Sequence, residues 1–476
     1  MKRMGIAIVL LSILLSGCAR RPNSDFESVE NRINSLIRKQ IEWRNSNFAA
    51  AKKEDTAGRE LSVDEAVQIA LFNNPSLQAT FEELGIADAD LMESGLLKNP
   101  VFDAAIRFPD KGPASAKQEF SLVFNFIDLI MIPVRKKVEG MRFEATKTRV
   151  TLAVLNLASE TRKAYFELQG EQSKLTSRKT MLDAAQAASE FAQKLMKAGN
   201  ITELAALPKV TAFHQANLEV MRAELEVAGI REKLNRAMGL SGTEITWRIP
   251  GQLPALPAQD AGDVPALESQ AVAQRLDLDA QRQEVAIVDK ARALRHWGVF
   301  TAVQVGPSTE RDPDGVRVTG PAVQMEMPIF NQGKADRARL ASQLRQSRAR
   351  LEALEVSARS EIREELAHMK SARATVEYYR DHLNPLRARA LELTQERYNN
   401  MTLSGLDLLS AKQDQLLSEI EQTQALRDYW IHRTELEHAL GGALPSAPVA
   451  ATLTGVISSE TAPAEKPAEP MHERQQ

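Results

Sequence analysis

The stretch VLNLASETRKAYFELQGEQSKLTSRKTMLDAAQAASEFAQKLM (154–196) decides the fold class of this chain. Its residues at seven-residue steps form one helical stripe that is largely apolar. The members of this stripe are Val154, Thr161, Leu168, Leu175, Leu182, Ser189 and Met196. No proline occurs from Val134 to Ala198, so about 65 residues can form one helix of roughly 100 Å. We therefore expect a long coiled-coil helix rather than a helix of a globular domain.

The same unit occurs twice. Residues 195–200 (LMKAGN) align with 397–402 (RYNNMT) and 237–239 (AMG) align with 439–441 (ALG), both at an offset of 202, while 74–78 (NPSLQ) align with 275–279 (RLDLD) at an offset of 201. Matches in order at nearly one offset predict an internal two-fold sequence repeat. Turns at 198–200 and 399–400 should separate each long helix from a returning helix, which makes each copy a long antiparallel helical hairpin.

Local signals place several helix boundaries. Ser62 with Glu65 forms a capping box that should begin the first helix. Pro75 interrupts this helix and can open its second half as a first-turn residue. In the second copy, Pro385 should kink the long helix that runs from Gly333 towards Asn400.

Four short segments alternate between apolar and polar residues, as strands with one apolar face do. They lie around 102–108 and 120–126 in the first copy and around 299–306 and 323–327 in the second, and loops at 109–113 and 311–315 join each pair. Their length suits tilted strands that cross a bilayer, although a soluble hairpin packed on the helices is the alternative. The residues expected to face lipid are Phe102, Ile106, Phe108, Phe120, Leu122, Phe124, Val323 and Met325.

Four strands cannot close a membrane barrel, because closure needs about eight and open strand edges are untenable in lipid. Subunits would have to pool their strands, and a trimer would supply twelve, with the polar alternate residues lining a wet lumen. The expected fold class is therefore mainly α with a small β part. Each copy is expected to supply a long antiparallel coiled-coil hairpin, and the chain to supply four strands of a barrel that several subunits share.

The N-terminus carries an export signal. Lys2 and Arg3 precede an apolar run at 6–15 that is too short to span a membrane, which needs about 20 apolar residues. The following LSGC (15–18) resembles the bacterial lipobox, which implies that Cys18 is lipidated after removal of residues 1–17. Ala19, in place of Asp, implies outer-membrane sorting. An ordinary signal peptide with a chance cysteine is the alternative, but Cys18 is the only cysteine in the chain, which also excludes an internal disulfide.

Composition argues against two function classes. The formal net charge is −3 and opposite charges are interspersed, so no basic stripe indicates nucleic-acid binding. No histidine pair at metal-ligand spacing, phosphate loop or nucleophile elbow occurs. His432 and His438 are expected on an exposed helical surface. We therefore expect no enzyme activity, no cofactor and no metal site.

The order and spacing of several motifs resemble the TolC-type outer-membrane efflux family. The resembling segments are 61–66 (LSVDEA) with 74–77 (NPSL), 327–333 (MPIFNQG), 398–409 (YNNMTLSGLDLL) and 439–442 (ALGG), and the resemblance covers roughly 59–442. Segments 84–87 (LGIA) and 426–430 (LRDYW) look like the heavy-metal or copper-resistance branch.

This resemblance implies a homotrimer in which the long antiparallel coiled-coil hairpins form a periplasmic tunnel and four strands from each chain form a twelve-stranded outer-membrane β-barrel. It also implies the exit duct of a tripartite efflux system, which passively conducts substrate from an inner-membrane pump and a periplasmic adaptor across the outer membrane. Asp407 stands in the place of a gate-region acid, although Ser410 replaces the second acid often found there. The alternative for Asp407 is a solvated first-turn acid favoured by the helix dipole. The resemblance assigns the periplasmic tip, where the adaptor docks, to Gly199, Asn200, Ile201, Thr202, Met401, Thr402, Leu403, Ser404 and Gly405.

The expected organisation is a signal peptide (1–17), a lipid-anchored segment (18–58), a first repeat (59–250), a second repeat (251–442) and a disordered Pro, Ala and Glu-rich tail (443–476). Residues 25–51 should form a modest helix that wraps the tunnel. The rival function is a lipid-anchored periplasmic coiled-coil scaffold or tether without a channel. This rival gives no reason for alternating hairpins at equivalent repeat positions.

Overall fold

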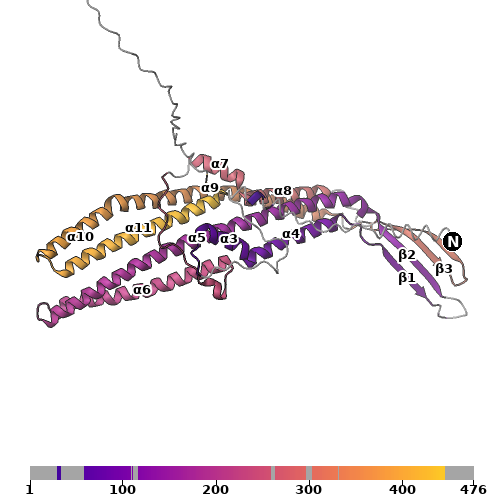
Figure 1. The fold of residues 1–476 in the computed structure, drawn as a ribbon. Coiled ribbons are helices and arrows are strands. Elements are labelled where there is room, and N and C mark those ends of the chain that lie inside the picture. The colour runs from indigo at the N-terminus through magenta and orange to yellow at the C-terminus, as the bar shows by residue number, and fades with distance from the viewer. Residues whose placement is uncertain are drawn as a thin grey trace, which may run out of the picture.

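The computed structural model describes residues 29, 31–33, 58–108, 110, 116–258, 263–295, 303–327, 329–330 and 332–444. The molecule is elongated, with a β-sheet at one end and two helical hairpins at the other (Figure 1). No helix in the described part is long and apolar enough to cross a membrane. Cys18, the export signal and nearly all of the tail lie outside the described residues.

The first half opens with α3 (Val63–Asn73) and α4 (Pro75–Ser94). The capping box expected at Ser62 is confirmed, since Ser62 Oγ accepts from the backbone N–H of Glu65 and the Glu65 carboxylate accepts from the backbone N–H of Ser62. Asn74 caps α4 and Pro75 occupies its first turn, as expected. These local signals set the boundary between the two helices.

The long helix α5 (Phe126–Lys197) and the returning helix α6 (Glu203–Met238) form the first hairpin. The expected start at Val134 was wrong, because α5 begins before Pro133. Asn125 caps it by accepting from the N–H of Ile127 at 3.2 Å. Arg135 donates to the carbonyl of Asp128 at 3.1 Å, which supplies a side-chain donor close to the site where Pro133 has no N–H. A short 3-10 turn, η1 (Gly242–Ile245), follows α6.

The second half repeats the order of elements. It contains α7 (Val264–Gln274), α8 (Leu276–Arg295), α9 (Lys334–Tyr378), the π-helical segment η2 (Tyr379–Leu383), α10 (Asn384–Asn399) and α11 (Gly405–Ala439). A kink was expected at Pro385, and the structure has a π-helical turn immediately before α10, whose first turn contains this proline. Helices α10 and α11 form the second hairpin (Figure 1).

The sheet is antiparallel with the order β1 (Val101–Arg107), β2 (Lys117–Asn125), β3 (Val303–Arg311) and β4 (Arg317–Met325). Several boundaries differ from expectation, including the start of β2 at Lys117 rather than at Phe120. Strand β2 ends at Asn125, which caps α5, and β4 begins well before Val323. Strand β3 extends to Arg311, so the predicted loop shrinks to a turn in which the N–H of Gly315 donates to the carbonyl of Asp312 at 2.9 Å. Residues 299–302 lie outside the described part.

The buried core lies where the helices of each half meet, between the sheet and the tips. One cluster joins α3, α5 and α6 around Trp247, and another joins α7, α9 and α11 around Tyr429. A third includes Val29 and Ile33, so the described part of the N-terminal segment packs against α3, α4 and α5. Most of residues 25–51 lie outside the described part, so the helix expected there stays a prediction.

A close backbone contact holds α6 against the start of α4. Gly239 ends α6 at a φ of 65°, and a Cβ there would lie 2.6 Å from the carbonyl oxygen of Asn73. Asn74 Nδ2 donates to the carbonyl of Ala237 at 2.9 Å, which satisfies an orphan acceptor at the end of α6. The motifs at 74–78 and 237–239 thus meet in space.

Candidate functional sites in the sheet, the tips and the helix faces

The sheet has one apolar face. The register pairs Phe102 with Leu122, Phe124 with Val305 and Val305 with Val323, so residues of alternate positions share that face. The rings of Phe102 and Phe120 stack with centroids 6.4 Å apart. Of the residues expected to face lipid, Phe102 is 65% exposed and Val323 is 68% exposed. An exposed apolar sheet face of this kind marks a surface that contacts another protein or a membrane.

All the residues expected to face lipid occupy positions on this one side of the sheet, with Phe108 directly after the end of β1. They are Phe102, Ile106, Phe108, Phe120, Leu122, Phe124, Val323 and Met325. Within the described part of the chain no helix covers this face. Six of the eight side chains are exposed, and those of Phe120 and Leu122 are partly exposed.

The opposite face of the sheet is polar. Near the loop end of the sheet, Arg107 lies 3.4 Å from Glu119, and Lys117 pairs with Glu310 and lies 3.7 Å from Asp312. These ion pairs link β1, β2 and β3 across the polar face. The sheet is therefore amphipathic, with charge on one side and aromatic and aliphatic residues on the other.

Both edges of the sheet are open. Within the described residues, β1 has β2 as its only neighbour and β4 has β3 as its only neighbour. Each edge strand presents a row of unpaired backbone donors and acceptors, which natural proteins either cover or pair with another strand.

The first hairpin tip is a glycine turn. Gly199 has a φ of 76°, and the N–H groups of Gly199 and Asn200 donate to the carbonyls of Met196 and Leu195, each at 3.0 Å. This arrangement closes the end of α5 as a Schellman motif does. Thr202 then caps α6 by accepting from the N–H of Ala205 at 3.3 Å.

The second tip repeats this turn without a glycine. Met401 occupies the position of Gly199 with a φ of 57°, and within the described residues no other non-glycine has a positive φ. The N–H of Thr402 donates to the carbonyl of Arg397 at 2.9 Å. Left-handed backbone costs a non-glycine residue about 1 kcal/mol, and the Met401 side chain is 94% exposed. The turn expected at 399–400 is thus centred one residue later.

Asp407 belongs to a capping box at the start of α11. Its carboxylate accepts from the backbone N–H of Ser404 at 3.0 Å and from Ser404 Oγ at 2.8 Å. These hydrogen bonds hold the pKa of Asp407 below its usual value, and the charge of Lys209 on α6 acts in the same direction. The first-turn role of Asp407 is therefore present, while its role as a gate stays a prediction.

Helix α6 carries an exposed apolar stripe on the side away from α5. Its residues are spaced as the a and d positions of a heptad. The stripe consists of Leu204, Leu207, Leu218, Met221 and Leu225. Each of these side chains is at least half exposed, and Leu204 and Leu225 exceed 75% exposure. Apolar heptad positions without a partner indicate a helix–helix contact that one chain does not complete.

The two hairpins are joined by a buried ion-pair cluster between α5 and α11. Glu171, with only 2% of its side chain exposed, pairs with Arg427 and lies 2.8 Å from Lys174. The Arg427 stem crosses α5 at Gly170, where a Cβ would lie 2.7 Å from the arginine Cγ. Gly170, an interior glycine of a very long helix, is explained by this crossing.

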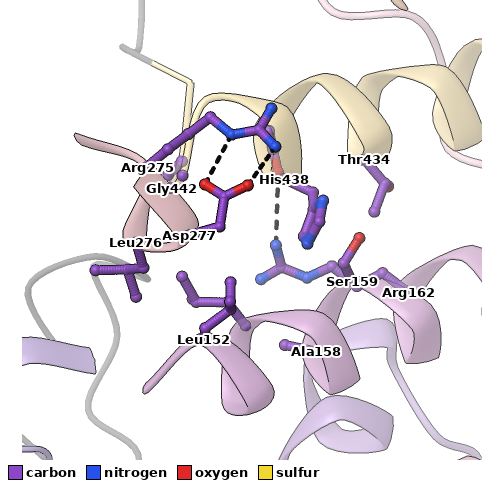
Figure 2. Close-up of a pocket in the computed structure, with 14 residues that line it drawn as sticks. Leu152, Ala158, Ser159, Arg162, Arg275, Leu276, Asp277, Thr434, His438 and Gly442 are labelled. Carbon is purple, nitrogen blue, oxygen red and sulfur yellow. Dashed lines mark hydrogen bonds and ion pairs between the residues drawn. The ribbon is translucent and has the colours of Figure 1, made fainter. Parts of the chain in front are cut away.

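A small cavity of about 70 Å³ lies where the two halves meet, between α5, the start of α8 and the end of α11 (Figure 2). Arg275 pairs with Asp277 at 2.8 Å, and Arg162 lies 3.5 Å from Glu437. Burial raises the pKa of Glu437, while the positive charges of Arg162 and Arg433 act in the opposite direction. Because these charged groups pair with one another across the two halves, we assign the cavity to the packing of the halves and not to a ligand.

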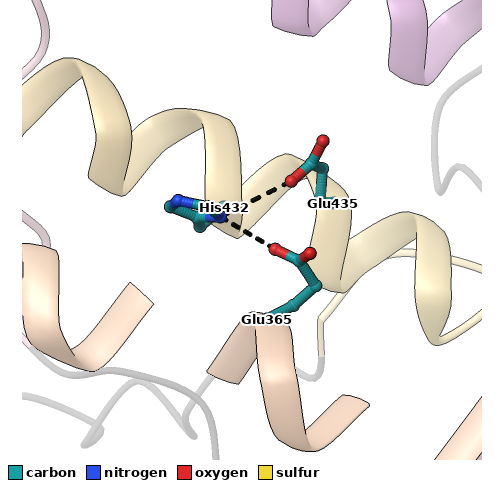
Figure 3. A group of neighbouring side chains, drawn as sticks. All are labelled: Glu365, His432 and Glu435. Atoms are coloured by element: carbon teal, nitrogen blue, oxygen red, sulfur yellow. Dashed lines mark hydrogen bonds and ion pairs between the residues drawn. The ribbon is translucent and has the colours of Figure 1, made fainter. Parts of the chain in front are cut away.

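A half-buried histidine joins α9 and α11, and the expectation that His432 is an exposed surface residue was wrong. His432 Nδ1 lies 2.9 Å from a carboxylate oxygen of Glu365 and 3.5 Å from one of Glu435 (Figure 3). The hydrogen bond with Glu365, followed by that with Glu435, raises the pKa of His432 to about 9. Sequence reasoning missed this site because Glu365 lies on another helix.

The fold is that of solved outer-membrane channels. The chain is similar to the CmeC outer membrane channel of Campylobacter jejuni, with a TM-score of 0.69 and 17% identity over 84% of this chain and 92% of that one. It is also similar to a membrane protein from Pseudomonas aeruginosa, with a TM-score of 0.68 and 19% identity over 85% and 97% of the two chains.

A third structure, the open state of the MtrE outer membrane channel of Neisseria gonorrhoeae, has a TM-score of 0.61 and 18% identity over 85% of this chain and 98% of that one. No family model and no curated protein sequence matches the chain. The TolC-type fold expected from the motifs is confirmed, and the heavy-metal branch stays a prediction.

Proposed function

We propose that the protein is the outer-membrane exit duct of a tripartite efflux system, which passively conducts substrate delivered by an inner-membrane pump and a periplasmic adaptor. The observation that carries this proposal is the amphipathic four-stranded sheet, whose exposed apolar face and open edges are combined with long helical hairpins. A soluble scaffold has no use for such a sheet, because an exposed apolar face and unpaired edges favour aggregation in water.

The duct is a homotrimer in this proposal. Three copies of the sheet give a closed twelve-stranded barrel in which every edge is paired, with the apolar face towards lipid and the ion-paired face towards a wet lumen. Support also comes from the α6 stripe, which offers a neighbouring chain two apolar segments, at 204–207 and 218–225, separated by the polar positions Thr211 and His214. Sheet and stripe thus call for the same partner, a second copy of this chain.

The lipid anchor at Cys18 belongs to the same proposal. The N-terminal segment is held against the helices after the anchor, since Val29 and Ile33 are buried and Arg32 lies 2.7 Å from Asp279. A lipobox cysteine receives a diacylglyceryl group, and two acyl chains are enough to anchor a protein stably, so lipidation of Cys18 would fix this end in the outer membrane beside the barrel.

The two hairpin tips form the periplasmic end, where the adaptor docks and where Asp407 is the gate candidate. The proposed contact residues are those of the two turns: Gly199, Asn200, Ile201, Thr202, Met401, Thr402, Leu403, Ser404 and Gly405. The exposed and strained Met401 supports this assignment, because backbone strain on an exposed apolar residue is typical of functional positions.

Reconstitution into planar lipid bilayers tests the proposal. Wild-type protein should give discrete steps of ion current, whereas a scaffold would give none. Asp407→Asn should increase the current if this carboxylate helps to hold the tip closed. An absence of current from the wild type and the variant would contradict the duct, and equal currents from both would remove Asp407 as the gate.

A separate experiment tests the tip. Leu403→Glu should abolish adaptor-dependent export in cells while the amount of trimer stays unchanged. The matched control is Leu97→Glu, an exposed leucine beyond the end of α4 and far from the tips, which should leave adaptor-dependent export intact. Unchanged export with Leu403→Glu would contradict the docking assignment.

A further inference from the structure

Two antiparallel helices of the second half bring complementary short motifs together. Helix α9 carries Glu365 and His368, spaced three residues apart, and α11 carries His432 and Glu435 at the same spacing. Because residues three apart lie on one side of a helix, each pair projects into the seam between the helices. The rings of His368 and His432 stack with centroids 4.8 Å apart.

Three potential ligand atoms converge in this seam. His432 Nδ1, one oxygen of Glu365 and one oxygen of Glu435 all lie within 4.8 Å of one another. The distances from Nδ1 to the two oxygens are 2.9 and 3.5 Å. In a tetrahedral zinc site with bonds of about 2.0 Å, neighbouring ligand atoms lie roughly 3.3 Å apart. Small side-chain movements would therefore bring all three atoms to one ion.

We propose that Glu365, His432 and Glu435 bind one divalent transition-metal ion, such as Zn²⁺, through His432 Nδ1 and one oxygen of each carboxylate. Imidazole and carboxylate together form a ligand set that suits Zn²⁺ and its neighbours in the first transition series. The two carboxylates neutralise the ion. Water fills the remaining position, as in zinc sites with three protein ligands.

The surroundings suit a site that can be loaded from solvent. The side chains of Glu365, His432 and Glu435 are 20%, 26% and 30% exposed, so they are partly desolvated yet reachable. Lys163 on α5 lies 3.0 Å from Glu435 Oε1, which leaves Oε2, the oxygen nearer His432, available to a metal ion. Its positive charge also opposes the metal, so Lys163→Ala should tighten binding. His368 stacks on the imidazole face and so orients the ring.

In the metal-free protein, the same three groups are held together by the proton on His432 Nδ1. When the ion binds, that proton leaves to solvent and the Nδ1 lone pair binds the metal. The exchange keeps α9 and α11 linked, so the site can be filled without parting the helices. The inference does not depend on whether the chain conducts.

The experiment uses the full-length protein, purified in detergent with a tag that contains no histidine and stripped with a chelator. Isothermal titration with Zn²⁺ should give one site per chain, with a heat that depends on the ionisation enthalpy of the buffer because a proton is released. Co²⁺ should give a visible absorption band at the same stoichiometry. His432→Gln should weaken Zn²⁺ binding at least a hundredfold and Glu365→Gln at least tenfold.

The matched control is His214→Gln, an exposed histidine of α6, which should bind one Zn²⁺ as the wild type does. Glu365→Gln keeps His432 in place, so it tests the site even if His432→Gln alters the fold. Failure of the wild type to bind stoichiometric Zn²⁺ would overturn the proposal. Equal binding by the wild type, His432→Gln and Glu365→Gln would overturn it as well.

Discussion

Replacing two leucines of the α6 stripe with serine should weaken the trimer. Leu218 is 51% exposed and Leu225 is 76% exposed in the single chain, and full burial of a leucine contributes about 1.5–3 kcal/mol. If a neighbouring chain covers what is now exposed, the double variant Leu218→Ser, Leu225→Ser should lose about 3 kcal/mol at each interface. That loss corresponds to about a hundredfold in affinity, since 1.4 kcal/mol is tenfold.

The assay is light scattering during size-exclusion chromatography in detergent, over a dilution series that measures the fraction of trimer at each protein concentration. The wild type should remain trimeric at concentrations where the double variant is largely dissociated. Glu226→Ser, a polar replacement on the same turn as Leu225, is the control and should behave as the wild type does. If the double variant and the wild type dissociate at the same concentration, the stripe is no subunit interface and the reasoning fails.

Four further substitutions test the local packing and the cap of α11. Gly170→Ala would place a methyl group against the Arg427 stem and should lower the free energy of unfolding by about 1–3 kcal/mol. Gly85→Ala, whose added methyl group meets no atom within 4 Å, should raise the free energy of unfolding by about 1 kcal/mol. Denaturant unfolding that ranks the two variants the other way would contradict this packing argument. Tyr165→Phe removes a buried hydrogen bond of 2.8 Å and should cost about 1 kcal/mol in the same measurement, and an unchanged midpoint would exclude that contribution. Ser404→Ala should cost about 1 kcal/mol at the start of α11, seen as faster amide exchange there, and unaltered exchange would show that the cap contributes nothing.

The parts of the fold that follow from short-range rules were predictable. The capping box at Ser62, the proline that opens α4 and the left-handed turn at Gly199 depend on neighbouring residues and occur as expected. The strand faces were also predictable. Successive side chains of a strand point to opposite sides of the sheet, so alternation of apolar and polar residues assigns each side chain to one face. All residues expected to face lipid therefore lie on one side of the sheet.

The errors arose where tertiary context outweighs local preference. Pro133 was taken as the limit of the long helix, but Asn125 caps an earlier start and Arg135 donates to a backbone carbonyl near the proline. Strand ends were misplaced because their lengths depend on pairing across the two halves of the chain. The alignment of 195–200 with 397–402 places Met401 opposite Gly199, but a methionine gave no sign that it would adopt the left-handed conformation.

The seam around His432 shows a different limit of sequence reasoning. Its partner Glu365 lies 67 residues away on another helix, and the search for histidine pairs within one helix did not cover it. The signal that could have found it is the reversed pair of three-residue spacings, Glu then His on α9 and His then Glu on α11. The antiparallel course of the two helices was expected, but their axial register, which brings Glu365 level with His432, was not.

Electron microscopy of the full-length protein, extracted from outer membranes in detergent, tests the account most directly. The account predicts particles with three-fold symmetry and a central channel, longer than about 100 Å because α5 alone has 72 residues, with a narrow barrel at one end and paired hairpins at the other. Monomers, or solid rods without a central channel, would contradict the trimeric duct.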